Sequence, residues 1–549
     1  MKKLGKILSL LMAIVMVFSV VGCGDKTEET DMGTPPDYSA EVDNKFAFYG
    51  YHAMYNGVYQ MEGETIDTGK NHRTDPEYYK DYAACGMTRM FFQPIYYQYD
   101  VTGGGNLEKF ENSLLKQCMD LAKDAGIKEG VVPDWRIYRL TEQYLGETHL
   151  WLEDDLDGKT YTFNKLSETE LKDIASQLGR EAKTAFTYRF PTKSKLVDFV
   201  GTCLSEYEDH EVFYSVLLMD EPTKDLIQSS ADVFEAIRLY NSTKQEGAKK
   251  VKISQIILPL YGAPGLFFEG NENEGQTKED VYRNYVKTYI EKTGTDFIAP
   301  DYYPIKPDSI EPEQLKGLRI CAELAEEYGI NFDVLLQTWA WRNNASDKYR
   351  ICQKDDLYWQ MNQLMGFGVD TFIFYTYAAK SAPNYYNSGT YHPNNSTFIN
   401  YEGEKTDIYY NMQTIMSEMK KFEKVIRHFD YTASATYKVL PLDALEGYTY
   451  ETNDSLKKVT DVKLEQGDLA LVNEMYDEEK GNYMYLLQNI HDPSNGKSFD
   501  TTINAEVTFS DEYNYVAVYF KGEVSYHKLV DHKYSTVLSA GYAEFLLPY

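Results

Sequence analysis

The stretch "VFYSVLLMDEP" (residues 212–222) restricts the fold more than any other part of the sequence. Its apolar run lacks polar alternation, which is typical of a strand buried on both faces of a parallel sheet. Pro222 ends the strand, and Asp220 and Glu221 stand directly before it. Paired carboxylates at the end of a buried strand indicate either a helix cap or the mouth of an active site.

Seven further segments resemble this one, and helical patterns separate them. The predicted strands are residues 45–52, 88–97, 129–138, 212–222, 252–262, 296–305, 331–341 and 370–378. The helical segment 407–426 carries one apolar stripe, formed by Ile408, Met412, Ile415, Met419, Phe422 and Ile426. Eight strands alternating with helices predict an α/β fold, a (β/α)₈ TIM barrel over residues 44–428. An open doubly wound sheet is the alternative, but no Gly-rich phosphate loop follows the first strand.

The pattern changes after His428. Residues 429–549 contain short alternating or apolar runs that Gly, Asn, Asp and Pro separate, without a convincing helical period. This texture predicts a C-terminal all-β sandwich domain with no chemistry of its own.

The N-terminus has the pattern of a targeting segment. Three lysines precede a short apolar run that ends in "VVGC" at Cys23. We expect residues 1–22 to be a signal peptide, and "VVGC" resembles the lipobox of bacterial lipoproteins, in which the cysteine is lipidated. Residues 23–43 are polar and contain Pro, which predicts a flexible tether. The expected location is therefore the extracytoplasmic face of the cell membrane, with a lipid anchor on Cys23; the alternative is an ordinary signal with a chance cysteine.

Composition narrows the choice of partners. The formal net charge of −30 argues against nucleic acid, because phosphate binding requires clustered Lys and Arg. The remaining five cysteines are widely spaced and form no C-x-x-C pair, so we expect small core residues, no metal site and no cofactor. The 49 tyrosines suit polar rings such as sugars, although many are expected simply to pack between strands and helices.

The ends of the predicted strands supply the candidate site, because reactive groups in such barrels lie at the C-terminal ends of strands. Carboxylates surrounded by aromatic rings, with no metal cluster and no Ser-His-Asp spacing, predict a carbohydrate site. The candidate substrate-binding residues are Tyr51, His52, Asp134, Trp135, Tyr261, Tyr302, Tyr303, Gln337, Trp339, Trp341 and Tyr375.

Cleavage of a glycosidic bond requires one carboxyl that stays protonated and a second group that stabilises the positive anomeric carbon. We expect Glu221 to be the general acid, because neighbouring Asp220 and the apolar strand should oppose its ionisation. Asp301 is the first candidate for the second carboxylate and Asp220 the next. The competing interpretation is that each of these residues caps the helix that follows.

These features resemble the (β/α)₈ glycoside hydrolases secreted by gut and soil bacteria. The closest likeness is to lipoprotein members with "DEP" on strand four and "D-x-Y-P" on strand six, here residues 220–222 and 301–304. In the large retaining clan of these enzymes, strand four carries an Asn-Glu pair and strand seven a Glu nucleophile. The resemblance implies that Glu221 is the acid/base.

The sequence departs from that clan at two positions. Asp220 stands where the clan has Asn, and strand seven offers Gln337 without a Glu. Three outcomes stay open. Asp301 replaces the nucleophile or acts as a base; or the Asp-Glu pair works as in substrate-assisted hexosaminidases, with Tyr302 or Tyr303 holding the acetamido oxygen; or the chain is a non-catalytic glycan-binding surface lipoprotein.

Overall fold

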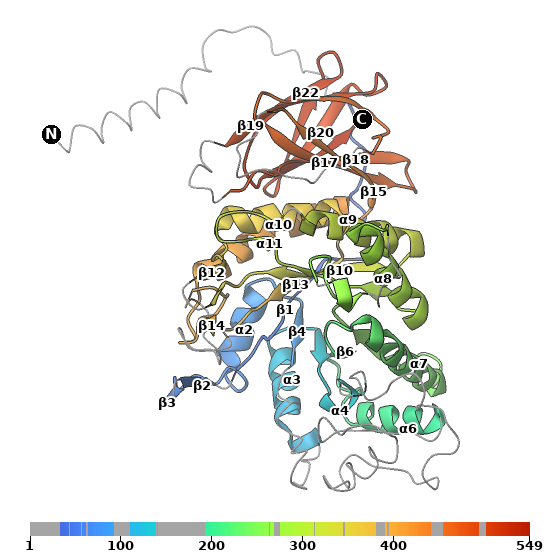
Figure 1. The fold of residues 1–549 in the computed structure, drawn as a ribbon, viewed down its shortest axis with the longest axis vertical. Helices are drawn as coiled ribbons and strands as arrows, with labels where there is room; N and C mark the ends of the chain where they lie inside the picture. The colour runs from blue at the N-terminus through green and yellow to red at the C-terminus, as the bar shows by residue number, and fades with distance from the viewer. Residues whose placement is uncertain are drawn as a thin grey trace, which may run out of the picture.

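The protein is described here by a computed structural model (Figure 1). The structure describes residues 33–42, 44–55, 57–61, 64–92, 110–138, 140, 193–262, 264–267, 275–311, 313–343, 346–379, 390–391, 393, 395–440, 454–493 and 501–549. The signal peptide and the lipidation site expected at Cys23 lie outside these residues.

Two parallel sheets form the first part of the chain. One has the order β4-β5-β6-β7, and the other has the order β1-β13-β10-β8, with β9 also paired to β10. The strands are β1 (Ala47–Gly50), β4 (Arg89–Phe91), β5 (Glu129–Val132), β6 (Phe213–Leu217), β7 (Lys252–Ser254), β8 (Phe297–Ile298), β9 (Asp301–Tyr302), β10 (Asn331–Gln337) and β13 (Thr371–Tyr375). Each of the eight predicted segments therefore contains a parallel strand, as the continuous apolar runs indicated.

Backbone contacts also join the two parallel sheets to one another. Ile257, beyond the end of β7, forms a parallel bridge with Pro300, between β8 and β9. On the other side, the Thr88 amide donates to the Phe48 carbonyl at 2.8 Å, which connects β4 to β1. The fold is thus mixed α/β with all of these strands running in one direction.

Helices follow the parallel strands along the chain. They are α2 (Pro76–Ala84), α3 (Leu114–Asp124), α4 (Trp135–Tyr138), α6 (Lys193–Leu204), α7 (Ile227–Thr243), α8 (Lys278–Thr293), α9 (Glu313–Tyr328), α10 (Lys354–Gly366) and α11 (Asp407–Ile426), with 3₁₀ turns η2 (Phe110–Asn112), η6 (Lys224–Leu226) and η7 (Pro264–Leu266). The whole stripe predicted for α11 is buried. Gly329 ends α9 at a φ of 62°, a left-handed conformation that glycine adopts without strain.

One predicted strand is shorter than expected. The sequence suggested an extended segment over residues 129–138, but β5 ends at Val132 and residues 135–138 form α4. Pro133 cannot donate to the ladder, and the Asp134 carbonyl then accepts the amides of Ile137 and Tyr138. These backbone bonds turn the chain into a helix directly after the strand.

The first part of the chain also contains two small antiparallel sheets, which the sequence did not predict. They are the pair β2 (Val58–Met61) and β3 (Glu64–Asp67), and the three strands β11 (Trp341–Asn343), β12 (Ser346–Tyr349) and β14 (Thr390–Tyr391).

The C-terminal part consists of antiparallel sheets in its described residues, as the alternating pattern predicted. A six-stranded sheet has the order β15-β17-β18-β23-β20-β21, and a three-stranded sheet has the order β16-β19-β22. Their bounds are β15 (Asp430–Lys438), β16 (Val459–Lys463), β17 (Leu469–Asp477), β18 (Asn482–Asn489), β19 (Thr502–Phe509), β20 (Tyr515–Phe520), β21 (Glu523–Lys528), β22 (Lys533–Ser539) and β23 (Ala543–Pro548). Side chains of both sheets share one apolar core, exemplified by Val472, Leu487 and Ile503.

The six-stranded sheet also packs against the first part of the chain. Helices α10 and α11 lie between the parallel strands and this sheet (Figure 1). Trp359 of α10 is fully buried, and its indole N–H donates to the Ile490 carbonyl at 3.3 Å. A single apolar core therefore runs from the parallel strands through these helices into β17, β18 and β23.

Residues 33–42 pack against the protein surface, although the sequence assigned them to a flexible tether. Tyr38 is only 5% exposed, and its hydroxyl donates to Asp477 at 2.7 Å. Its ring also contacts His428 and Phe429. This segment therefore lies across the junction between the end of α11 and the C-terminal sheets.

Candidate active site

The turn after β6 carries the paired carboxylates. Apolar Val216 and Leu217 anchor this strand in the core, and the chain then turns sharply at Glu221, whose φ is 48°. A non-glycine residue seldom adopts this left-handed conformation, and such residues cluster at functional sites. The turn is held by the Glu221 amide, which donates to the Ile256 carbonyl at 2.9 Å, and by the Tyr285 hydroxyl, which donates to the Pro222 carbonyl at 2.6 Å.

Asp301, at the start of β9, meets this turn. Its carboxyl group lies within hydrogen-bonding reach of the Glu221 carboxyl. Asp301 is 8% exposed, whereas Glu221 is exposed. Burial raises the pKa of Asp301 well above its usual range, and the negative charges of Glu221 and Asp220 add to this effect. The surroundings of Asp301, the buried member of the pair, therefore favour its protonated form.

The surroundings of Glu221 differ from those expected from the sequence. The apolar strand was expected to oppose the ionisation of Glu221, but the turn at positive φ leaves this side chain exposed. Desolvation acts on Asp301 instead. Among the described residues, no Lys or Arg forms an ion pair with Glu221.

Two tyrosine hydroxyls orient the acidic group. The Tyr303 hydroxyl donates to Asp301 Oδ1 at 3.3 Å, and the Tyr51 hydroxyl donates to Asp220 Oδ2 at 3.0 Å. The hydrogen bond from Tyr303 favours the ionised form of Asp301 and partly offsets the rise of its pKa. Asp220 is thus held by Tyr51, which directly follows β1.

A continuous series of ring contacts lies beside these carboxylates, linked to them through Tyr51 and Tyr303, and we call it the aromatic wall. It consists of Tyr51, His52, Tyr303, Trp339, Trp341, Tyr349 and Tyr375. Tyr375 lies at its centre, with its ring centroid 5.9 Å from Tyr51, 5.7 Å from Tyr303 and 5.4 Å from Trp339. Flat apolar faces beside carboxylates suit a sugar ring, which offers C–H faces to stack and hydroxyls to bond.

Tyr261, also predicted for the site, lies beside the wall. Its pKa is raised by burial first and then by the negative charge of Asp301. The Lys306 ammonium lies 5.7 Å from the Tyr261 ring and 4.2 Å from the Tyr349 ring. The structure therefore adds a cation to the rim of the site.

The sequence missed Tyr349 and Lys306. Tyr349 lies on β12, and the hairpin register pairs it with Trp341, so that both rings lie on one side 5.9 Å apart. The polar run between two aromatic residues, "WRNNASDKY", was the signal that could have indicated this hairpin.

Three predicted residues are turned away from the site. Asp134 is fully buried; it is paired with Arg136 at 2.7 Å and accepts the Tyr207 hydroxyl at 3.0 Å. The Tyr302 hydroxyl donates to Gln363 of α10 at 2.6 Å. These groups bond within the core, so we leave them out of the proposed site.

Gln337, at the end of β10, is the third of these residues. Its amide oxygen accepts the Ile305 amide at 2.8 Å, and its amide nitrogen donates to the Ile305 carbonyl at 3.0 Å. Gln337 therefore holds the loop after β9 rather than a ligand. The side chain of Trp135 lies outside the described residues, although its backbone begins α4.

Two kinds of feature are absent from the described ranges, a membrane-spanning helix and a metal-binding cluster. None of their helices is both long and apolar enough to cross a bilayer. They also bring together no set of three His, Cys, Asp or Glu side chains arranged to hold a metal ion. The five cysteines within these ranges are free and buried, which confirms their prediction as core residues.

Comparison with known proteins gives a distant likeness in fold. No family model and no curated protein sequence matches the chain. A GH27-β-L-arabinopyranosidase from Geobacillus stearothermophilus has 9% identity, coverage of 92% of this chain and 96% of that chain, and a TM-score of 0.45. An α-amylase from Geobacillus thermoleovorans in complex with acarbose has 12% identity, coverage of 93% and 99%, and a TM-score of 0.40. A GH99 endo-α-mannosidase from Bacteroides thetaiotaomicron has 11% identity, coverage of 70% and 99%, and a TM-score of 0.36. These neighbours are glycoside hydrolases, but at such scores the likeness does not define the activity of this chain.

Proposed function

We propose that this chain is a glycoside hydrolase whose reactive carboxylates lie at the C-terminal edge of a closed (β/α)₈ barrel. The observation that carries the proposal is the group of Asp220, Glu221 and Asp301 beside the aromatic wall. A buried carboxyl with a raised pKa, beside an exposed carboxyl at a strained turn, is the arrangement expected of acid chemistry.

Barrel closure is supported by one side chain that reaches both parallel sheets. Arg89 on β4 is paired with Glu129 on β5 and donates to the Tyr214 hydroxyl on β6 at 3.1 Å. The same guanidinium donates to the Thr371 hydroxyl on β13, in the other sheet, at 3.3 Å. A group with neighbours on both sheets is expected where the strands curve around a common interior. Side chains of both C-terminal sheets share one apolar core. We therefore also propose that these two sheets form a sandwich.

The contact between Asp301 and Glu221 restricts the mechanism. Carboxyls that flank a glycosidic bond lie about 5–5.5 Å apart in retaining enzymes and about 6.5–9.5 Å apart in inverting enzymes. Two groups within hydrogen-bonding reach are closer than either arrangement. We therefore propose that Asp301 and Glu221 hold one proton together and that the exposed Glu221 delivers it to the glycosidic oxygen.

Asp220 is then the remaining carboxylate for the anomeric carbon. Held by Tyr51, it lies beside Glu221 in the chain, so it has the position expected for orienting a 2-acetamido group that attacks from within the substrate. We propose this substrate-assisted reaction on 2-acetamido sugars. Comparison of 2-acetamido and 2-hydroxy chromogenic glycosides tests it, and equal turnover of both would exclude the assisted route.

The experiment for the activity itself uses protein that begins at Gly33, so that the packed segment 33–42 is retained. Release of reducing ends from a panel of glycosides and oligosaccharides is expected for the wild type. The Glu221→Gln variant should lose at least about 100-fold in kcat, the usual contribution of a general acid, while it keeps its fold. Unchanged turnover in this variant would remove Glu221 from its assigned role.

A second candidate function is a glycan-binding surface protein without catalysis. The end of β10 favours it, because Gln337 stands there with its amide engaged to Ile305 and offers no carboxylate opposite Glu221. This function predicts micromolar oligosaccharide binding by calorimetry without any product.

For either function, we propose that Cys23 is lipidated and holds the protein on the outer side of the cell membrane. Incorporation of a labelled fatty acid in the wild type, but not in Cys23→Ser, tests this proposal.

A further inference from the structure

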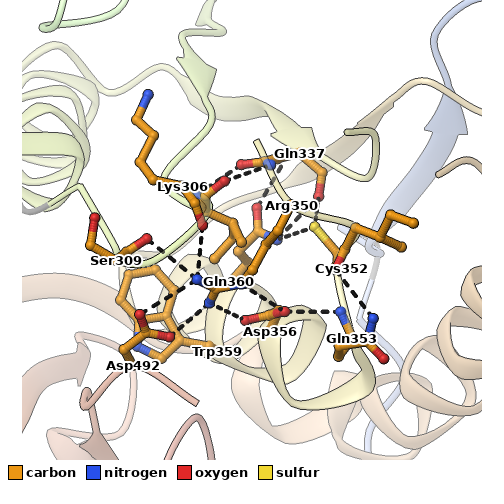
Figure 2. A network of polar contacts seen from close by, with 12 residues as sticks. Lys306, Ser309, Gln337, Arg350, Cys352, Gln353, Asp356, Trp359, Gln360 and Asp492 are labelled. Carbon is orange, nitrogen blue, oxygen red and sulfur yellow. Dashed lines mark hydrogen bonds and ion pairs between the residues drawn. The ribbon is translucent and has the colours of Figure 1, made fainter. Parts of the chain in front are cut away.

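A buried ion cluster joins the C-terminal sheets to the loops of the site (Figure 2). Arg350, directly after Tyr349 in the chain, pairs with Asp356 in the first turn of α10 and with Asp492 beyond the end of β18, each at 2.7 Å. The Asp356 side chain is fully buried, that of Asp492 is 4% exposed and that of Arg350 is 13% exposed. Such a cluster requires closely fixed geometry, because each charge has lost most of its water.

The same guanidinium holds the loop after β9. Arg350 Nη1 donates to the Lys306 carbonyl at 2.8 Å. Gln337 holds the preceding residue, Ile305, through both atoms of its amide. This loop is therefore fixed from the end of β10 and from Arg350 at once, and Figure 2 shows both groups around it.

The two segments that Arg350 holds carry the rim of the site. Tyr349 packs against Trp339, with ring centroids 5.6 Å apart, and Lys306 lies over the Tyr349 ring. A shift of Arg350 would move Tyr349 and Lys306 together, because one is its neighbour in the chain and the other lies on the loop that it binds.

We propose that Asp492 of the C-terminal domain is a positioning residue for the site and that it acts through Arg350. The C-terminal domain thereby supports the binding site, although none of its described side chains belongs to the aromatic wall. The choice of a sugar as the ligand rests on the proposed function. The role of Asp492 in holding Arg350 does not. This positioning role predicts that loss of the Asp492 charge loosens the rim and weakens sugar binding, whereas the carboxyl pair and its chemistry are retained.

The test compares Asp492→Asn with the wild type and with Asp511→Asn, a change of the same kind at an exposed position of the same domain. Asp492→Asn keeps the Arg350–Asp356 pair, so we expect the fold to survive. Asp492→Glu should restore part of the effect. If Asp492→Asn does not fold, Arg350→Lys serves instead, because lysine keeps the charge but lacks the planar fork.

Two measurements decide the outcome. Amide hydrogen exchange in residues 303–311 and 346–352 should be at least about tenfold faster in Asp492→Asn and unchanged in Asp511→Asn. The Kd for triacetylchitotriose, used as the 2-acetamido probe, should rise by about 5- to 20-fold, with kcat at saturation within about twofold of the wild type.

Wild-type exchange in both segments would overturn the inference, whatever happens to thermal stability. Faster exchange with an unchanged Kd would also overturn it, because the rim would then be loosened without consequence for the ligand. A wild-type protein that binds no member of the sugar panel would instead contradict the proposed function, and the exchange arm would still decide whether Asp492 positions the rim.

Discussion

At the scale of single residues, the proposed chemistry depends on the different surroundings of two neighbouring carboxyls. Asp301 is buried and Glu221 is exposed, and the pKa of Asp301 is raised by burial and by the neighbouring charges. A proton on Asp301 is available to the pair until the pH rises through this raised pKa. The rate of an acid-dependent reaction should therefore fall on the alkaline side.

Removal of the Tyr303 hydroxyl tests this dependence. The hydroxyl donates to Asp301 and stabilises its ionised form, so Tyr303→Phe should raise the pKa of Asp301 further. The alkaline limb of the pH profile of kcat should therefore move to higher pH. Tyr410→Phe, at an exposed position outside the site, is the matched control, and an alkaline limb that moves to lower pH in Tyr303→Phe would contradict the assignment.

The sequence could predict which residues lie at the ends of strands, but not which of their side chains point into the site. Tyr302 and Tyr303 are adjacent, and successive side chains of a strand point to opposite faces. The Tyr302 side chain points toward α10 and the Tyr303 side chain toward Asp301. A shift of the strand register by one residue would exchange these two directions. Asp134 was misleading because its partner, Arg136, is two residues away in a helix that the sequence did not indicate.

At the scale of elements, the parallel strands could be predicted because each is a continuous apolar run. The hairpin of β11 and β12 was missed, because its short polar run has no strong period and only the aromatic residues at its two ends mark it. The same holds for the loop between β3 and α2, where His72 is 3% exposed and stacked on Tyr78 with ring centroids 4.2 Å apart. Neither ring nitrogen of His72 has a hydrogen-bond partner among the described residues.

This loop should make the protein sensitive to acid. Burial, with the charges of Lys70 and Arg73, lowers the pKa of His72 to about 4. Because the folded-state pKa lies below the unfolded value of about 6.5, stability is lost as the pH falls from about 6.5 towards 4. His72→Phe should remove about 2 kcal/mol of the stability difference between pH 7.5 and pH 5, measured by urea unfolding. The exposed control His527→Phe should show the wild-type pH dependence, and the same dependence in His72→Phe would refute the prediction.

At the scale of the whole molecule, the two parts of the chain share one core. The change of texture near residue 428 predicted a separate C-terminal domain, and β15 begins at Asp430. The sequence could not reveal the contacts across this boundary. The helix and sheet surfaces that meet there would be apolar whether they packed against one another or against other elements. Trp359, Gln488 and Asn362 bond across it, and the core side chains are continuous through it.

Continuous burial predicts cooperative unfolding of both parts. Scanning calorimetry of protein that begins at Gly33 should show one transition, and a chain that ends at residue 428 should lose that transition and associate through its exposed apolar surface. Two well-separated transitions in the longer protein would contradict the shared core.

The central claim is that Asp301 and Glu221 hold one proton for cleavage of a glycosidic bond. The most direct measurement is the pH profile of reducing-end release from triacetylchitotriose by the wild type, Asp301→Asn and Glu221→Gln. The account predicts activity in the wild type that declines on the alkaline side, at least about a 100-fold loss in Glu221→Gln, and a changed alkaline limb in Asp301→Asn. Wild-type rates and an unaltered profile in both variants would contradict it.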